Sequence, residues 1–120
     1  MSNFYNKISN IAYPYIIAEI GSNHNGDMSL AKKLIDKAVE AGADCIKFQS
    51  WTKETIFSKK KYEDNFFLKD DYRKRRDTNL EKIVDKYSIS SDQLLELYNY
   101  CKDKNIDCTS TPFSHSEADF

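Results

Sequence analysis

The sequence lacks the features that mark several large classes of protein. Its 120 residues contain no apolar run of transmembrane length, and the first ten residues do not have the charged-then-apolar layout of a secretory signal. The 18 basic and 19 acidic side chains leave a net charge of −1, which gives no basic footprint for nucleic acid and no attraction to a membrane surface. With 40% hydrophobic residues, the composition is that of a globular domain and not of a disordered segment.

Residues that commonly hold metals or form disulfides are also few. The two histidines, His24 and His115, have no supporting ligand spacing, and we expect His24 to bond the backbone of its own turn. The three cysteines, Cys45, Cys101 and Cys108, are odd in number and contain no C-x-x-C pair. They favour buried, reduced thiols in a cytosolic protein over a disulfide or a metal site.

The first half of the chain predicts a strand–helix–strand unit. Residues 15–20, YIIAEI, are short and β-branched, which is typical of a buried strand. The polar loop that follows is not the dinucleotide motif, because it lacks G-x-G-x-x-G. Apolar residues at helical spacing over 28–42 predict a helix that Asp27 caps and Gly42 stops. Residues 45–50, CIKFQS, predict a second strand, parallel to the first.

A further unit follows near the end of the chain. Ser90 and Gln93 fit a capping box, a helical apolar stripe follows them, and Asn105 ends it. The sequence IDCTST from Ile106 predicts a third strand. The segment after that strand, PFSHSEADF, predicts the start of another helix, cut off at residue 120.

Between the second and third strands lies a long insertion, over about residues 50–79. It is predicted to be too polar and irregular for a core. Its basic clusters, Lys59–Lys61 and Arg73–Arg76, alternate with acidic residues, which favours a solvated excursion over a phosphate-binding patch. Long loops of this kind often carry function. LEKIVDKY, residues 80–87, predicts a short helix.

The order of elements predicts an α/β fold with a parallel sheet. Three such strands leave an open edge and an exposed face. A (β/α)8 TIM barrel needs about 250 residues, so the chain fits the N-terminal portion of one, about three βα units long. A doubly wound open sheet is the competing architecture.

Polar residues stand at or near the carboxyl end of each predicted strand, where parallel α/β folds place their chemistry. Lys47 and Gln49 are two residues apart and therefore share one face of the sheet. Glu19 and Lys47 on adjacent strands could form an ion pair. Lys47 suits a phosphate or carboxylate, Thr111 can donate a hydroxyl hydrogen bond to the same anion, and Gln49 suits a polyhydroxylated or N-acetylated ligand.

A purely structural interpretation of these residues stays open. The Glu19–Lys47 pair could serve only the fold, and Thr111 followed by Pro112 could simply end a strand.

Three blocks, IAEIGSNHNGD, AVEAGADCIKFQS and TSTPFS, resemble the sialic acid synthases, the family of N-acetylneuraminate, legionaminic acid and pseudaminic acid synthases. The blocks stand in family order and span most of the chain from Ile17 to Ser114. The resemblance implies a (β/α) barrel that condenses phosphoenolpyruvate with an N-acetylmannosamine-type sugar. The products are a nine-carbon sugar acid and phosphate. It also implies a divalent metal, Mn²⁺ or Mg²⁺, that polarises the sugar aldehyde.

The resemblance assigns roles by motif. Glu19 matches an active-site carboxylate, Lys47 a phosphoenolpyruvate ligand, Gln49 an acceptor-sugar contact and Thr111 a phosphate-side hydroxyl. It further implies a cytoplasmic enzyme and a homodimer when intact. The family's two metal-ligand histidines lie in later strands, so we expect this chain to hold no metal ligands and to be inactive by itself.

One departure from the family concerns the acceptor sugar. A family asparagine after the second strand touches the sugar, but the loop here is longer and different, and Asn65 and Asn79 are both candidates. The exact acceptor and metal therefore stay open.

Two other functions stay open beside the synthase. One is a non-catalytic, phosphosugar-binding or self-assembling βα module whose exposed sheet is covered by self-association. The other is another phosphoenolpyruvate-dependent barrel, such as a 3-deoxy-sugar-acid phosphate synthase.

Overall fold

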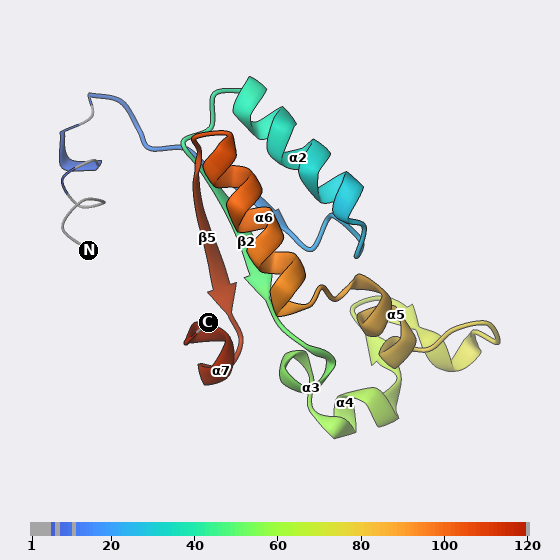
Figure 1. Cartoon of the computed structure of the whole chain (residues 1–120). Coiled ribbons are helices and arrows are strands. Elements are labelled where there is room, and N and C mark those ends of the chain that lie inside the picture. The colour runs from blue at the N-terminus through green and yellow to red at the C-terminus, as the bar shows by residue number, and fades with distance from the viewer. Residues whose placement is uncertain (1–5, 7, 11, 120) are drawn as a thin grey trace.

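Three parallel strands form the main sheet of the computed structural model, which describes residues 6, 8–10 and 12–119. The strands are β1 (Ile17–Gly21), β2 (Cys45–Ser50) and β5 (Asp107–Pro112), and they lie side by side in that order (Figure 1). Both pairings are parallel, which confirms the predicted α/β fold with a parallel sheet. The predicted strands were right to within two residues at their ends.

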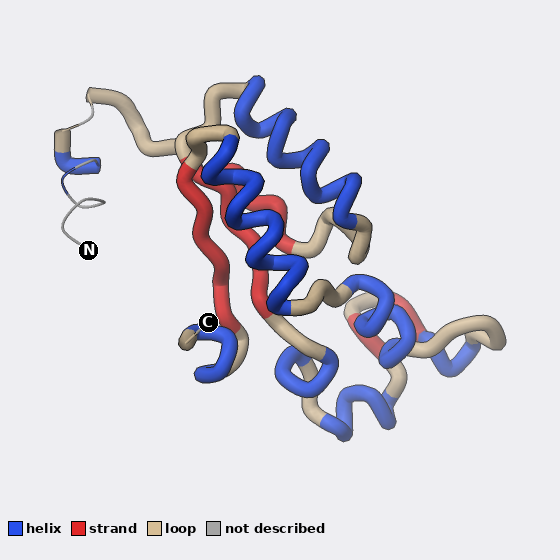
Figure 2. The backbone as a smooth tube through the Cα atoms, in the orientation of Figure 1, coloured by secondary structure: helices blue, strands red, loops and turns tan. Residues whose placement is uncertain are grey.

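Two long helices cover one face of this sheet. They are α2 (Met28–Glu40) and α6 (Ser91–Asp103), and both lie on the same side of the strands (Figures 1 and 2). The predicted caps are confirmed: Asp27 accepts from two backbone N–H groups of α2, and a capping box begins α6. Gly42 adopts a φ of +80° just past α2, where a glycine ends a helix without strain.

The core lies between this helix layer and the sheet. Its buried side chains come from the helix-facing sides of β1 and β2, from the residue just before β5 and from the inner stripes of both helices: Ile20, Ala31, Ile35, Ile46, Phe48, Leu97, Cys101 and Ile106. The alternation of the strands sends the other set of side chains to the opposite face. That face is largely open: Ile17 is 48% exposed, and Thr109 and Thr111 are exposed.

The insertion after β2 contradicts one prediction, because it has a hydrophobic core of its own. Trp51, Tyr72, Leu80 and Val84 are buried together, and further aromatic residues pack around them. The elements of this excursion are α3 (Lys53–Ile56), α4 (Lys59–Asp64), β3 (Phe66–Phe67), β4 (Asp70–Asp71), η1 (Tyr72–Lys74) and α5 (Leu80–Tyr87). The prediction of a segment too polar for a core was wrong, because its aromatic residues follow neither a helical nor a strand period and meet only after the chain turns.

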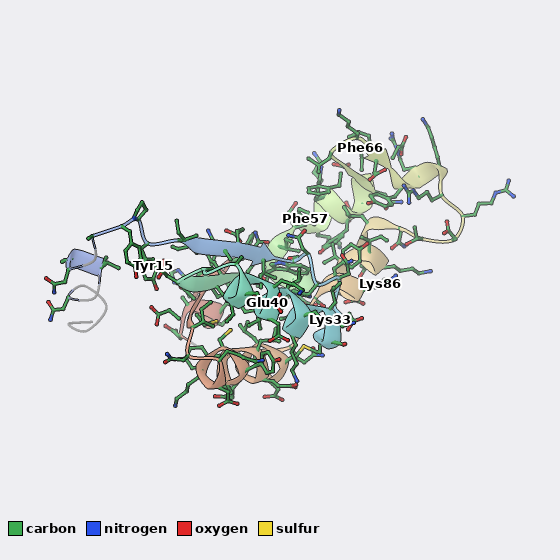
Figure 3. The ribbon with its side chains drawn as sticks, turned by 90° about the horizontal axis from the view of Figure 1, so that it is seen from above. Tyr15, Lys33, Glu40, Phe57, Phe66 and Lys86 are labelled. Carbon is green, nitrogen blue, oxygen red and sulfur yellow. The ribbon has the colours of Figure 1, made fainter. Side chains whose placement is uncertain are left out.

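The excursion lies beyond the carboxyl ends of the strands. Figure 3 shows Phe57 and Phe66 at that end, and Tyr15 at the opposite end of the sheet. After β5, the short helix α7 (His115–Ala118) begins at its N-cap Ser114, so the predicted helix is confirmed. Within the part of the chain that the structure describes, no helix has the length and apolar character needed to cross a membrane.

Candidate functional site

Glu19 and Lys47 form an ion pair on the open face of the sheet. The strand register places them directly opposite each other on β1 and β2, and Lys47 Nζ contacts Glu19 Oε2. Their side chains are 46% and 36% exposed, respectively. An ion pair this open to water contributes about 0–1 kcal/mol. Lys47 can therefore exchange Glu19 for an incoming anion at little cost.

Gln49 and Thr111 lie on the same face, nearer the carboxyl ends of the strands. They are register partners on β2 and β5, and two residues earlier along the same strands Lys47 is paired with Thr109. Thr111 is exposed and Gln49 is half-buried. The structure thus brings the four predicted site residues onto one face, at the end where parallel α/β folds bind their ligands.

A bulge at the end of β1 shapes the space beside Gln49. The pairing shifts between Glu19 and Gly21, so that Gly21 lies opposite Phe48, and Gly21 adopts a φ of +54°. A Cβ at Gly21 would lie 3.4 Å from Gln49 Nε2 and 3.5 Å from Glu19 Oε1. Glycine therefore fits the left-handed backbone and leaves room for both site side chains.

Sequence reasoning missed Ser22 and Trp51, which lie beside Gln49. Trp51 Nε1–H donates to Ser22 Oγ over 3.1 Å, and Ser22 Oγ–H donates to Gln49 Oε1 over 3.4 Å. Both residues directly follow a strand, and Trp51 is the single tryptophan of the chain. That position was the available signal, but only the folded pairing of β1 with β2 brings the two residues together.

His24 is a structural residue of the loop, as predicted. Its side chain is buried, and its Nδ1 accepts a hydrogen bond from Gly26 N over 3.0 Å. Burial lowers the pKa of the imidazole below its ordinary value, because desolvation disfavours the charged form. The turn lets Gly26 approach the excursion so closely that a Cβ there would lie 2.1 Å from the carbonyl oxygen of Lys86.

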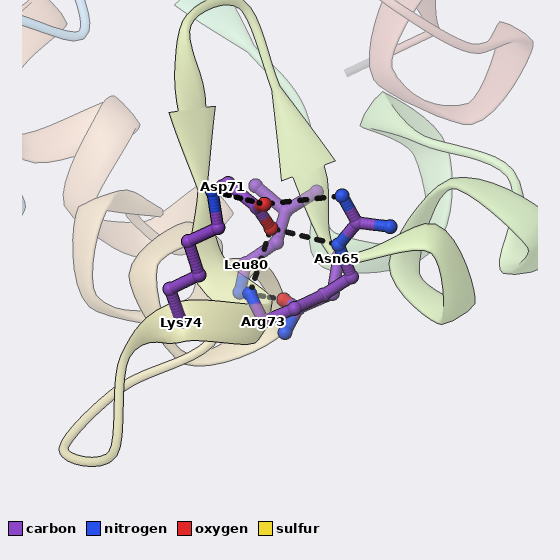
Figure 4. Close-up of polar contacts among 5 residues, drawn as sticks. All are labelled: Asn65, Asp71, Arg73, Lys74 and Leu80. Atoms are coloured by element: carbon purple, nitrogen blue, oxygen red, sulfur yellow. Dashed lines mark hydrogen bonds and ion pairs between the residues drawn. The ribbon is translucent and has the colours of Figure 1, made fainter.

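The two candidate asparagines of the excursion serve as caps. Asn65 Oδ1 accepts from Leu80 N over 2.8 Å, and Asn79 Oδ1 accepts from Lys82 N over 2.8 Å (Figure 4 shows the former). Asn65 also ends α4 with a φ of +50°. Both amide oxygens therefore hold the local fold.

The basic cluster beside these caps is largely neutralised. Asp71 pairs with Arg73 and Lys74 (Figure 4), and Arg75 pairs with Asp70. This pairing favours paired surface charges over a phosphate-binding patch.

The three thiols do not lie at the candidate site. Cys45 and Cys101 are buried as predicted, and Cys108 is partly exposed. A hydrogen bond links Cys101 with Cys108, and together with burial it raises the pKa of the Cys108 thiol. Among residues 6, 8–10 and 12–119, no three His, Cys, Asp or Glu side chains converge as metal ligands.

One hollow of the molecule lies away from these residues. It has a volume of about 620 Å³ and is lined by residues at the amino-terminal end of the sheet, among them Ile17, Tyr98 and Asp107. Neither Lys47 nor Gln49 lines it. Charge and strand position, and not cavity size, therefore mark the candidate site.

Comparison with known proteins places the chain in a family. The model of the NeuB family matches residues 34–120, which is more than half of the chain. The chain belongs to the NeuB family. Lys47, Gln49 and Thr111 fall within the matched segment, and Glu19 precedes it. The resemblance to sialic acid synthases is thereby confirmed.

Individual relatives of this NeuB-family chain carry sugar-acid synthase names. It is 39% identical over 104 residues to the N,N'-diacetyllegionaminic acid synthase of Campylobacter jejuni subsp. jejuni. The aligned segment covers 87% of the chain and 30% of that synthase. The chain is 35% identical over 106 residues to the human N-acetylneuraminate-9-phosphate synthase, with 88% and 28% covered.

A solved structure supports the same relationship. The N-acetylneuraminic acid synthetase of Leptospira borgpetersenii serovar Hardjo-bovis superposes with a TM-score of 0.67 at 30% identity. The match covers 88% of this chain and 31% of the synthetase. The chain thus spans less than a third of the length of these three relatives.

Proposed function

We propose that the chain forms about three βα units at the N-terminus of a (β/α)8 barrel. The spatial order of the strands equals their order in the chain, and both long helices cover one face, as consecutive barrel units require. One half of a doubly wound sheet has the same arrangement. The similarity to sugar-acid synthases supports the barrel.

The proposed reaction is the condensation of phosphoenolpyruvate with an N-acetylmannosamine-type sugar. The observation that carries it is the shared face of Glu19, Lys47, Gln49 and Thr111 at the strand ends of a NeuB-family chain. A cation, a hydroxyl, an amide and a carboxylate within this small area suit an anionic three-carbon substrate and a polyhydroxylated partner.

Each side chain has a proposed step. Lys47 and Thr111 bind the phosphate or carboxylate of phosphoenolpyruvate, and Lys47 exchanges its contact with Glu19 for the substrate anion. Gln49 holds the acceptor sugar while the C=C bond of phosphoenolpyruvate opens and its terminal carbon bonds to the aldehyde carbon of the sugar. The C=O bond of the aldehyde becomes a hydroxyl group by taking up a proton, and an oxocarbenium carbon is left on the former phosphoenolpyruvate. Water then adds to the oxocarbenium carbon, and phosphate leaves with cleavage of its C–O bond. Glu19 stabilises the positive charge or accepts the proton of that water.

The remaining properties belong to the proposal for the intact protein. We propose a cytoplasmic homodimer that uses Mn²⁺ or Mg²⁺. That metal would polarise the sugar aldehyde, and because the described residues form no metal cluster, its ligands would come from another part of the intact protein. Because the chain spans less than a third of its relatives' length, we expect the 120 residues alone to release no phosphate.

A chimera tests the proposal. The matching segment of the Leptospira borgpetersenii synthetase is replaced by this chain, and folding is checked by circular dichroism and size-exclusion chromatography. We expect phosphate release from phosphoenolpyruvate that depends on an N-acetylated amino sugar, with a nine-carbon acid detected by mass spectrometry. A folded chimera that makes no such acid with any of several acetamido sugars would refute the assignment.

A further inference from the structure

We infer that Ser22 and Trp51 are positioning residues that fix the side-chain amide of Gln49 with its NH₂ group toward Glu19 and the open face of the sheet. The inference deepens the proposed function, because it rests on Gln49 being a ligand contact there. It is carried by the hydrogen-bond chain from Trp51 Nε1 through Ser22 Oγ to Gln49 Oε1, with distances of 3.1 Å and 3.4 Å.

The direction of this hydrogen-bond chain follows from its donors and acceptors. An indole N–H only donates, so Ser22 Oγ must accept from Trp51. The single hydroxyl proton of Ser22 is then directed away from Trp51, and the side-chain amide of Gln49 lies within hydrogen-bonding distance of it. That proton needs an acceptor, and the amide offers one only in Oε1. The oxygen of Gln49 therefore faces Ser22 and the NH₂ group faces away.

The surroundings of the NH₂ group favour the same orientation. A Cβ at Gly21 would lie 3.4 Å from Gln49 Nε2 and 3.5 Å from Glu19 Oε1, so the NH₂ group and the carboxylate both lie against Gly21. A carboxylate oxygen attracts an N–H donor and repels a carbonyl oxygen. A flipped amide would place its oxygen on the Gly21 side, where the Glu19 carboxylate also lies, and leave the Ser22 proton without its acceptor.

The anchor of this hydrogen-bond chain is rigid. Trp51 is 8% exposed and packs with Tyr72, Leu80 and Val84 in the core of the excursion. The excursion is therefore linked to Gln49 through the indole N–H of Trp51, which donates to Ser22. The packing of the excursion thereby holds the orientation of Gln49.

The chemical consequence is a preference in the ligand. A fixed NH₂ group offers hydrogen-bond donors and no acceptor. It suits an acceptor oxygen, such as the carbonyl oxygen of an acetamido group, and offers nothing to the ammonium of a free amino sugar. Gln49 would thereby favour N-acetylated sugars.

Nuclear magnetic resonance on the ¹⁵N-labelled 120-residue chain tests the positioning. The chain has one tryptophan, hence one indole N–H signal, and two glutamines, Gln49 and Gln93. Gln93 Oε1 accepts from Ser90 N over 2.9 Å in a capping box, so its NH₂ group is the internal control. In the unaltered chain we expect a Gln49 NH₂ order parameter near the rigid value of about 0.85.

Three variants decide the matter. Ser22→Ala should lower the Gln49 order parameter below about 0.6, shift the indole signal and leave Gln93 unchanged. Trp51→Phe, which removes the indole N–H together with part of the ring, should loosen Gln49 in the same direction in a variant that stays folded. Ser22→Thr, which keeps the hydroxyl, should leave Gln49 ordered. An ordered Gln49 in folded Ser22→Ala would overturn the inference. Failure of the synthase assay would leave these signals unchanged, so the two claims fail separately.

Discussion

Replacing Gly26 with alanine should destabilise the chain far more than the same change at Gly42. Both glycines have positive φ, +75° and +80°, so alanine costs each about 1–2 kcal/mol from the left-handed backbone alone. The new Cβ at Gly26 would lie 2.1 Å from the carbonyl oxygen of Lys86, whereas nothing lies within 4 Å of the one at Gly42. Forcing the backbone apart there adds about 1–3 kcal/mol.

Urea unfolding, followed by circular dichroism and by the fluorescence of Trp51, measures the difference. With a denaturant slope of about 2 kcal/mol per molar urea, the midpoint of Gly26→Ala should lie about 0.5–1.5 M below that of Gly42→Ala. Trp51 emission should also shift to the red in Gly26→Ala, because α5 shares the core around Trp51 and Gly26 presses against the end of α5. Equal midpoints for the two variants would refute the packing of the loop against the excursion.

Three further predictions concern pH and capping. Burial lowers the folded-state pKa of His24 from its ordinary value of 6.5. The free energy of unfolding should therefore fall as pH drops below 6.5, by at most about 1.4 kcal/mol per pH unit. Urea titrations of His24→Gln should lack this contribution to the pH dependence. Arg73 lowers the pKa of Asp71 to about 2, so the stability that the Asp71 carboxylate contributes is complete above pH 3.8 and is lost as pH falls from 3.8 to about 2. The melting temperature of Asp71→Asn should therefore depend less on pH in that window than that of the unaltered chain. An equal pH dependence of the two melting temperatures would contradict the ion pair. Asn65→Ala should cost about 1–3 kcal/mol by removing the acceptor of the Leu80 N–H, and Asn65→Gly, which relieves only the positive φ, should recover part of the loss but not all of it.

Local patterns were enough to predict the three strands of the main sheet, the helices α2, α5, α6 and α7, and part of the site, but not the short elements α3, α4, β3, β4 and η1 of the excursion. The spacing of Lys47 and Gln49 places them on one face because side chains alternate along a strand, and the structure confirms it. The caps at Asp27 and Ser90 follow from side chains that bond backbone groups two or three residues away. Such contacts depend on short segments, which sequence patterns describe well.

The features that could not be predicted from the sequence depend on segments that come together only in the folded chain. The bulge that brings Gly21 against Gln49 exists only in the pairing of β1 with β2. The contact of Trp51 with Ser22 joins residues 29 positions apart. The core of the excursion collects aromatic residues with no common period, so its sequence looked like a solvated loop.

The kinetic effect of Lys47→Ala in the chimeric synthase shows whether Lys47 binds phosphoenolpyruvate. Losing a charge-assisted contact to phosphoenolpyruvate should raise its KM roughly tenfold to a hundredfold or lower kcat/KM by that factor. The control is Lys33→Ala, since Lys33 lies on α2, on the helix-covered side of the sheet (Figure 3). We expect a large loss for Lys47→Ala and none for Lys33→Ala; unchanged KM and kcat in both variants would contradict the role of Lys47 as a phosphoenolpyruvate ligand.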